Sequence, residues 1–410
     1  MIGVTLYICR CSKLNNRRDA YAPDNSMKFE FATATRILFG SGRIREAIPE
    51  IAAMGRTALI VTGNTPARLN TFIRDLGAQK VACVPFSIKS EPTIPLILNC
   101  VEVAKKAGCD IVIGYGGGSV LDGAKAAAVL LTNPGDPLDY LEVVGKGKPL
   151  TRSGAPCICI PTTAGTGCEV TRNAVLASPE HRVKVSLRSP KMLPSLAVID
   201  PELTLSMPRA LTASTGMDAV TQLIEPFVSR LANPMTDAVC RDGIQRAALW
   251  LRTACDDGEN IQARENMALA SLYSGLALAN AGLGAVHGLA APLGGAFGAP
   301  HGMVCARLLP IVMDANLKAL SARLKQSPAM SRYDEVARLL TRNPAACAKD
   351  GSKWIHSMCD ELSIPALSAF GIAGDDLPTV AEQAKRSSSM KGNPIDLTVD
   401  ELAEILNKAL

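Results

Sequence analysis

The sequence predicts an α/β domain with a Rossmann-like parallel sheet, followed by an all-helical domain. Three observations predict this fold class. The chain has 410 residues, which favours two hydrophobic cores of roughly 150–200 residues each. Short apolar runs alternate with helical patterns between residues 57 and 200, as in a doubly wound sheet. Strand patterns are almost absent after residue 208, so we expect a first domain over 27–208 and a helical domain over 209–410.

Five short apolar runs in the first half have the composition of buried parallel strands. Amphipathic helical patterns at 65–77 and 94–108 separate the first three runs, and each pattern ends in glycine, which is common where a helix ends. The predicted strands are TALIVTG (57–63), KVACVPF (80–86), DIVIGY (110–115), APCICIP (155–161) and LAVID (196–200).

The second half has helical spacing throughout its long segments. We expect a small-molecule site in the cleft between the two domains, where such sites are common. The predicted helices are RALTASTGMDAVTQLIEPFVSR (209–230), MTDAVCRDGIQRAALWLRTAC (235–255), ARENMALASLYSGLALANAG (263–282), the run after Gly302, and TVDELAEILNKAL (398–410).

The composition limits the expected partners and location. We interpret residues 1–26, which are basic and irregular, as an N-terminal extension, with the folded chain beginning near Met27. No apolar stretch approaches the ~20 residues of a membrane span, and the net charge of +5 forms no basic stripe, so we expect neither membrane nor nucleic acid as a partner. The 13 cysteines include no CxxC pair and are odd in number, which favours reduced thiols in the cytoplasm.

A glycine turn between a predicted strand and a predicted helix is the first candidate for cofactor binding. The stretch DIVIGYGGGSVLDGAKAAAVLL (110–131) places Gly116, Gly117 and Gly118 where a backbone can approach a ligand closely. The helix that starts near Ser119 directs its first amides at an anion, which is how a dinucleotide pyrophosphate is held. A tight strand-to-helix connection without a ligand is the alternative, because the spacing matches neither GxGxxG nor a P-loop.

A second candidate, PTTAGTGCEVT (161–171), follows the strand CICI directly and is rich in hydroxyls and glycines. We expect Thr162 and Thr163 to hydrogen-bond the cofactor where the strand ends. We interpret Cys168 as a small packing residue, because no histidine lies near it in the sequence to activate a thiol.

The end of the first predicted strand bears on the choice of dinucleotide. Gly63 and Asn64 stand where many NAD-preferring sites place an acidic residue against the ribose, so NADPH should be tolerated. Asp122 and Lys184 complete the predicted cofactor contacts. An exposed strand lysine is an equal alternative for Lys184, and Lys125 is spaced to form a local pair with Asp122.

Two of the four histidines, His287 and His301, lie in one segment, VHGLAAPLGGAFGAPHG (286–302). Asp218 and Gln222 are spaced i, i+4, so both side chains leave one face of a predicted helix. Together these four residues could surround one divalent ion, since aspartate and histidine are ordinary ligands of zinc and ferrous iron. Gln222 is a neutral and weak donor. From residue chemistry alone, two structural histidines remain an equal alternative.

The motifs of this chain resemble those of the iron-containing (group III) alcohol dehydrogenases, which have a dehydroquinate-synthase-like fold. The resemblance covers residue 28 to the C terminus. It consists of GGGSVLDGAK, PTTAGTGCEVT, VIDPELT, TASTGMDAVTQLIE, GLGAVHGLAAPLGGAFGAPHG and DLTVDELAEIL, all in the family's order.

The resemblance implies roles for particular residues. It implies that the first domain binds NAD(P) through residues 116–119 and 162–163. It also implies that Asp218, His287 and His301 are the catalytic metal ligands, for Fe²⁺ or Zn²⁺.

This chain departs from the family at two positions. The family usually has a histidine ligand where this chain has Gln222, so we expect Gln222 to act as a weak fourth ligand or to support the ligands from behind. Many relatives have a histidine, a candidate for proton relay, where this chain has Ala291.

We therefore expect an NAD(P)-dependent alcohol dehydrogenase or aldehyde reductase that acts on a small alcohol or aldehyde as a homodimer. The metal would polarise the substrate oxygen while a hydride passes between substrate and nicotinamide. One alternative is a dehydroquinate-synthase-like lyase, which would need a cationic, histidine-rich pocket. Another alternative is a metal-free nucleotide-binding relative with altered or lost catalysis. Gln222 and Ala291, which stand where the family has histidines, suggest this alternative. The metal-free maleylacetate reductase branch has different motifs.

Overall fold

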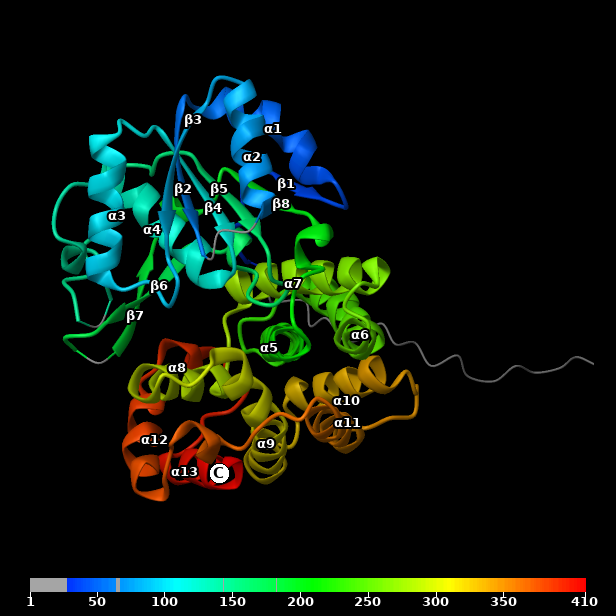
Figure 1. Cartoon of the computed structure of the whole chain (residues 1–410). Coiled ribbons are helices and arrows are strands. Elements are labelled where there is room, and N and C mark those ends of the chain that lie inside the picture. Colours follow the sequence, from blue (N-terminus) through cyan, green and yellow to red (C-terminus); the bar gives the residue numbers. More distant parts are fainter. Residues whose placement is uncertain (1–27, 64–66, 143, 182) are drawn as a thin grey trace, which may run out of the picture. The chain divides into compact units, whose positions relative to one another are not determined.

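A six-stranded parallel sheet organises the first part of the chain. The computed structural model describes residues 28–63, 67–142, 144–181 and 183–410, and residues 31–410 form one compact unit. The predicted extension at 1–26 lies outside the described residues. The strands in sheet order are β1 (Ile37–Phe39), β8 (Leu196–Ile199), β5 (Cys157–Pro161), β4 (Ile111–Gly116), β2 (Thr57–Thr62) and β3 (Ala82–Ser87) (Figure 1).

The direction in which strands are added to the sheet reverses between β2 and β4. From β2 the chain continues outward to β3 and then crosses back to β4 on the other side of β2. β2 and β4 pair directly, with Thr62 opposite Tyr115. Ligands of open α/β sheets bind at such a switch point, beyond the carboxyl ends of the strands. The segments after β2 and β4, predicted to bind the cofactor, therefore begin side by side.

Helices cover both faces of the sheet: α1 (Arg43–Met54), α2 (Ala67–Ala78), α3 (Ile94–Lys106) and α4 (Gly118–Thr132) (Figure 1). Successive residues of a strand face opposite sides of the sheet. In β2, Leu59 and Val61 belong to the core under α3 and α4, whereas Ala58 and Ile60 belong to the core under α1 and α2. This two-sided burial explains why the strands are nearly continuous apolar runs.

The predicted fold class is confirmed, and the structure adds elements that the sequence patterns did not reveal. β1 is only three residues long and half buried, so it has no period to detect. β6 (Asn173–Ser178) and β7 (Val183–Arg188) form an antiparallel hairpin that packs on α4. α2 continues past Gly77 to Ala78, and the left-handed residue that follows is Lys80, with a φ of 64°.

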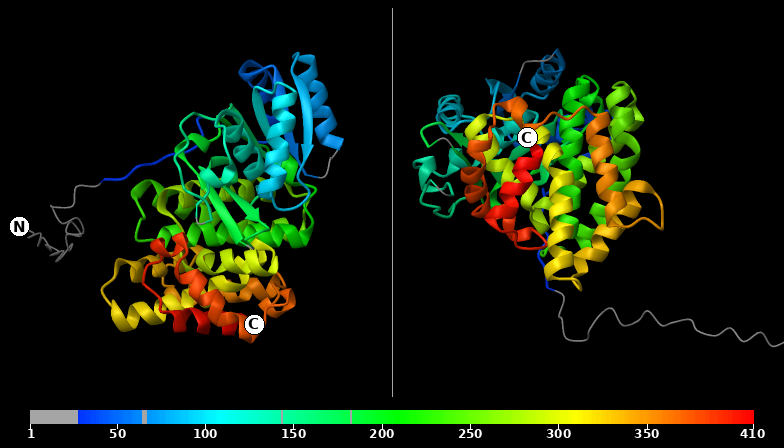
Figure 2. Two further views of the ribbon diagram at one scale, coloured as in Figure 1. Left: turned by 90° about the vertical axis from the view of Figure 1, so that its left-hand side faces the viewer. Right: turned by 90° about the horizontal axis from the view of Figure 1, so that it is seen from below.

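From residue 209 onward the chain is helical in long segments: α5 (Arg209–Val228), α6 (Pro234–Asp256), α7 (Ile261–Ala281), α8 (Ala285–Phe297), α9 (His301–Arg323), α10 (Pro328–Thr341), α11 (Ala348–Glu361), α12 (Leu377–Lys385) and α13 (Val399–Ala409). Figure 2 shows α12 and α13 on the side of these helices that is remote from the sheet. The division of the chain into separate domains over 27–208 and 209–410 stays a prediction.

In the described part of the chain, no single helix has the length and hydropathy of a membrane span. α7 and α8 meet that criterion only as a pair, and they are bent by 100° at their junction.

α5 is the central helix of the helical region. It contacts α6, α7 and α9, and almost every residue after its first turn is buried. This burial carries Asp218, Gln222 and Glu225 into the interior. Buried polar groups need hydrogen-bond or charge partners, so the surroundings of these three side chains are constrained.

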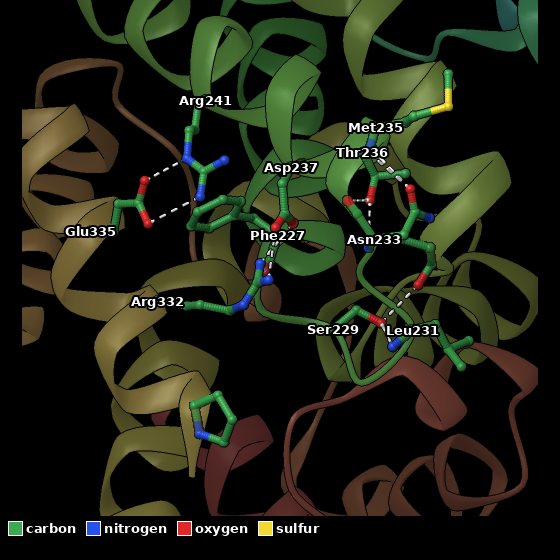
Figure 3. A network of polar contacts seen from close by, with 12 residues as sticks. Phe227, Ser229, Leu231, Asn233, Met235, Thr236, Asp237, Arg241, Arg332 and Glu335 are labelled. Carbon is green, nitrogen blue, oxygen red and sulfur yellow. Dashed lines mark hydrogen bonds and ion pairs between the residues drawn. The ribbon is translucent and has the colours of Figure 1, made fainter. Parts of the chain in front are cut away.

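An arginine holds α10 against α5 and α6 (Figure 3). Arg332 donates to both carboxylate oxygens of Asp237, each at 2.7 Å, and to the Phe227 carbonyl oxygen at 2.7 Å. Its guanidinium carbon also lies 5.1 Å from the Phe227 ring centroid, and that of Arg241, which pairs with Glu335, lies 5.2 Å from the same centroid. The Phe227 ring is therefore flanked by two cations, of which Arg332 is the more buried.

We expect Asp237→Ala to lower the free energy of unfolding by about 2–3 kcal/mol, because Arg332 would keep its half-buried position without a counter-charge. Urea denaturation followed by circular dichroism measures the change. The control is Glu335→Ala, which breaks the more exposed pair with Arg241 and should cost less than about 1 kcal/mol. Equal losses for the two variants would contradict this account.

Candidate active site

The glycine turn after β4 packs against the segment 161–171. A Cβ on Gly117 would lie 3.3 Å from the Thr163 side chain, and one on Gly118 would lie 2.8 Å from Thr166 Cγ2. The Thr162 amide donates to the Gly116 carbonyl oxygen at 3.0 Å. The structure thus brings together the two segments that the sequence predicted to hold the cofactor.

The N terminus of α4 is open at this turn. Its first residue is Gly118, and no side chain caps it. Ser119, Thr162 and Thr163 are each partly exposed beside it. Uncapped amides at a helix N terminus attract an anion through their hydrogen-bond donors and the helix dipole.

The end of β2 adjoins this turn. The carbonyl oxygen of Gly63 accepts a hydrogen bond from Ser87 Oγ at 3.0 Å. Asn64, the other residue predicted to contact the ribose, lies outside the described residues.

Asp122 and Lys184 have protein partners in the structure. Asp122 accepts a hydrogen bond from the Val175 amide at 3.0 Å and pairs with Lys125 Nζ at 3.0 Å, as the spacing predicted. The carboxylate thereby ties α4 to the β6–β7 hairpin. Lys184 pairs with Glu91. The cofactor roles of Asp122 and Lys184 stay predictions.

Lys125 is completely buried and fully engaged. Besides Asp122, its ammonium group donates to the Cys168 carbonyl at 3.0 Å and to Thr171 Oγ1 at 2.8 Å. Burial lowers the pKa of Lys125, but Asp122 together with Cys168 and Cys159 outweighs burial, and the pKa is raised. Lys125 is therefore permanently charged, and its ammonium group holds the segment 161–171 in place.

Four metal-ligating side chains converge at a second point: Asp218 on α5, His287 on α8, and His301 and Cys305 on α9. Their donor atoms all lie within 4.8 Å of one another. Asp218 Oδ1 is 3.6 Å from His287 Nε2 and 3.7 Å from His301 Nε2. Cys305 Sγ is 3.9 Å and 3.6 Å from the same two nitrogen atoms. Three of the four residues are buried, and His301 is exposed on one side.

The glycine that follows each histidine allows close helix packing around this cluster. A Cβ on Gly302 would lie 2.5 Å from the Ser214 carbonyl oxygen of α5, and one on Gly288 would lie 2.8 Å from Met390 Sδ. Gly298, with a φ of 64° at the end of α8, turns the chain so that α9 begins at His301. The repeated His-Gly pair is thus explained by packing as well as by chemistry.

The two oxygens of the Asp218 carboxylate have different environments. Oδ2 accepts a hydrogen bond from Gln222 Nε2 at 2.9 Å, and Gln222 Oε1 accepts one from Ser274 Oγ at 2.9 Å. Oδ1 is buried and, among the described residues, accepts no hydrogen bond. A buried carboxylate oxygen in this state requires a nearby positive charge. Its neighbours are the two imidazole nitrogens.

Glu225, two turns after Asp218 on α5, orients His287. Its Oε2 lies 2.6 Å from His287 Nδ1, and its Oε1 accepts a hydrogen bond from the Val286 amide at 2.7 Å. The carboxylate therefore holds the Nδ1–H tautomer and leaves Nε2 free to face the cluster. Carboxylates behind metal-binding histidines have this function.

The electrostatics of the cluster favour bound positive charge. Burial lowers the pKa of His287, but Cys305, Glu225 and Asp218 outweigh burial and raise it well above its usual value. Cys305, followed by Asp218, raises the pKa of His301. Burial raises the pKa of Asp218, but the two imidazoles outweigh burial and lower it. The donor set therefore attracts protons or a metal cation.

Cys305 and Glu225 were not singled out by the sequence analysis. The signal for Cys305 was its i, i+4 spacing from His301 in HGMVC, which places both side chains on one helical face. Glu225 follows Asp218 by seven residues, two turns of the same helix. The other two histidines lie elsewhere: His181 contacts Ser178 Oγ at 2.8 Å, and His356 pairs with an aspartate on α9.

Family models match nearly the whole chain. The model described as "Iron-containing alcohol dehydrogenase" matches residues 34–201, and the C-terminal model of the Fe-containing alcohol dehydrogenase family matches residues 212–410.

Individual proteins agree with the family models. Choline dehydrogenase of Bacillus subtilis is 34% identical over 380 residues, which cover 91% of this chain and 93% of that protein. The crystal structure of 1,3-propanediol oxidoreductase has a TM-score of 0.87 and 32% identity, and covers 93% of this chain and 100% of its own. Sulfoacetaldehyde reductase from Bifidobacterium kashiwanohense, solved in complex with NAD⁺, has a TM-score of 0.83 and 29% identity over 93% of this chain and 99% of its own.

We expect Gly118→Ala to weaken dinucleotide binding by about tenfold, the equivalent of about 1.4 kcal/mol. The added methyl group would meet Thr166 at 2.8 Å and push the segment 161–171 away from the helix N terminus. Quenching of protein fluorescence by NADH or NADPH measures the dissociation constant. The control is Gly77→Ala on α2, where no atom lies within 4 Å of the added methyl group. Unchanged binding by the Gly118 variant would contradict a cofactor role for this turn.

Proposed function

Since this chain belongs to the iron-containing alcohol dehydrogenase family, we propose that it interconverts a small alcohol and its aldehyde, with NAD(P) as hydride carrier and a divalent cation at the Asp218 cluster. The observation that carries the proposal is the convergence of one carboxylate and two imidazoles around a buried oxygen, Asp218 Oδ1, that accepts no hydrogen bond from the described residues.

The residues present fit a divalent cation. Imidazole nitrogen and carboxylate oxygen are ordinary ligands of zinc and ferrous iron. Their donor atoms are already within 3.7 Å of one another in the Asp218–histidine pairs, so binding requires little rearrangement. When bound, the cation supplies Lewis-acid polarisation of the substrate oxygen, and the nicotinamide supplies the hydride acceptor or donor.

Each protein group then has a defined task. Asp218, His287 and His301 would hold the cation, and Glu225 would keep the His287 ring in the tautomer that presents Nε2. The partly exposed His301 marks the side of the cluster from which a substrate can enter. Ala291, one turn after His287 on α8, offers no group for proton transfer. We therefore assign the exchange of the hydroxyl proton to water or to a ribose hydroxyl.

The dinucleotide is assigned to the switch point of the sheet. Its pyrophosphate would accept hydrogen bonds from the uncapped N terminus of α4, with Thr162 and Thr163 alongside. The NAD⁺ complex of sulfoacetaldehyde reductase, which has the same fold, supports a nicotinamide cofactor. Gly63 adds no carboxylate to repel a 2′-phosphate, which supports use of NADP as well.

The proposed setting is a homodimer in the cytoplasm. The 11 cysteines within the described residues are all free thiols, which supports a reducing compartment. Size-exclusion chromatography with light scattering tests the dimer.

We expect His287→Ala to abolish metal binding and to lower kcat/KM for alcohol oxidation by at least about 10³-fold, the equivalent of about 4 kcal/mol. Elemental analysis of the purified protein and an assay of NAD(P)H formation with a panel of small alcohols measure the two effects. The control is His356→Ala, at an exposed histidine of α11, which should change neither. Full turnover by a metal-free His287 variant would refute the proposal.

A second prediction concerns Glu225. We expect Glu225→Gln to weaken metal binding by about 10–100-fold, as is typical for groups behind a metal ligand. A carboxylate accepts from both His287 Nδ1 and the Val286 amide, whereas a glutamine offers a single acceptor oxygen. Competition with a chromophoric chelator measures the affinity. Glu361→Gln, an exposed carboxylate on α11, is the matched control, and an equal affinity for both variants would show that Glu225 has no supporting role.

A further inference from the structure

We propose that Cys305, rather than Gln222, supplies the fourth metal ligand, so that the site is an Asp-His-His-Cys centre that selects zinc over iron. This inference rests on the proposed function, because it concerns the same metal site.

Four of the six separations between the donor atoms are close to those of a tetrahedral zinc site, and all six are within 4.8 Å. With zinc–nitrogen and zinc–oxygen distances of about 2.0–2.2 Å and zinc–sulfur of about 2.3 Å, tetrahedral geometry gives about 3.4 Å between nitrogen and oxygen and about 3.6 Å between nitrogen and sulfur. The observed nitrogen–oxygen separations are 3.6 and 3.7 Å. The nitrogen–sulfur separations are 3.9 and 3.6 Å. Contraction by a few tenths of an ångström would bring these four pairs to tetrahedral distances.

The Cys305 thiol is placed for this task. It is completely buried, and its sulfur contacts His287 Nε2 and His301 Nε2, the same two atoms that face Asp218 Oδ1. The helical spacing from His301 keeps both donors on one face of α9. Another buried thiol of the same region, that of Cys359, instead donates to a backbone carbonyl, the ordinary partner of a structural cysteine.

Gln222 is already engaged at both ends of its amide. Its nitrogen donates to Asp218 Oδ2, and its oxygen accepts from Ser274 Oγ. Turning the amide oxygen toward a cation would set it against the carboxylate and break both hydrogen bonds. Gln222 is therefore a positioning residue. It holds Asp218 so that the other oxygen, Oδ1, faces the two histidines.

A sulfur ligand changes which metal ion the site prefers. Asp218 and a Cys305 thiolate together carry two negative charges, which match a divalent cation. Thiolate is a soft ligand that favours zinc, whereas two histidines and one carboxylate alone suit ferrous iron. In the proposed reaction the substrate oxygen would approach from the exposed side of His301 as a fifth ligand, a coordination number that catalytic zinc can reach.

Cobalt substitution tests the sulfur ligand directly. The full-length protein is stripped with a chelator and titrated with Co²⁺, and its absorption spectrum is recorded. We expect one Co²⁺ per chain and a near-ultraviolet sulfur-to-cobalt charge-transfer band. Cys305→Ser should remove this band, while Gln222→Ala and the control Cys240→Ser, at a buried thiol on α6, should keep it.

The zinc-loaded wild-type protein gives an independent measurement that needs no variant. Zinc-edge X-ray absorption should show one sulfur neighbour at about 2.3 Å. In competition for equal Zn²⁺ and Fe²⁺, both proteins should favour zinc, as divalent-metal sites generally do, and the preference should be measurably weaker in Cys305→Ser than in wild type.

The outcomes separate this inference from the proposed function. One Co²⁺ per chain without a charge-transfer band, or a band that survives in Cys305→Ser, would overturn the sulfur ligand whatever the catalytic activity. Wild type that shows the band but oxidises no alcohol would support the sulfur ligand and overturn the proposed function. A chain that takes up no metal would overturn both.

Discussion

A buried carboxylate with one free oxygen is the constraint on which this site depends. Asp218 is 2% exposed in the middle of α5, with Oδ2 held by Gln222 and Oδ1 facing two imidazoles. Removing a charged carboxylate from water costs several kcal/mol unless a counter-charge is near. α8 and α9 must therefore bring their histidines to this point. The glycine after His301 allows it, because any larger residue would collide with the backbone of α5.

The segment 161–171, which we propose to bind the cofactor, is packed directly onto α5, the helix that carries Asp218. A Cβ on Gly165 would lie 2.4 Å from the Thr215 carbonyl oxygen of α5, and one on Gly167 would lie 2.3 Å from Gly275 Cα of α7. Thr215 is one turn before Asp218. This close contact holds the segment 161–171 at a fixed distance from the donor cluster. A hydride can pass between substrate and nicotinamide only if both are held at a fixed separation, so these glycines would support the proposed reaction by setting the helix packing.

Much of the fold was predictable because its signals are local. The five strands were predicted from continuous apolar runs, and the helix α4 from the glycines before it. The prediction that β3 is buried was wrong, because β3 is at the edge of the sheet and is exposed or half-buried throughout. β1 was missed because three half-buried residues carry no period. Glu225 was missed because a glutamate in a helix is usually on the surface, and its burial depends on how α8 packs against α5. Cys305 was missed because a cysteine among apolar residues is usually a packing residue.

The sequence by itself determined which functional groups are present and the order of the main strands and helices. These groups are two histidines and an aspartate that can bind a metal, and a glycine turn that can bind a phosphate. Only the tertiary structure decided which donors meet. It turned the Gln222 amide toward Asp218, brought Cys305 to both imidazoles, and engaged Asp122 with the β6–β7 hairpin. The physical reason is that the metal donors come from α5, α8 and α9, and the distances between such side chains are set by helix packing, which no local pattern encodes.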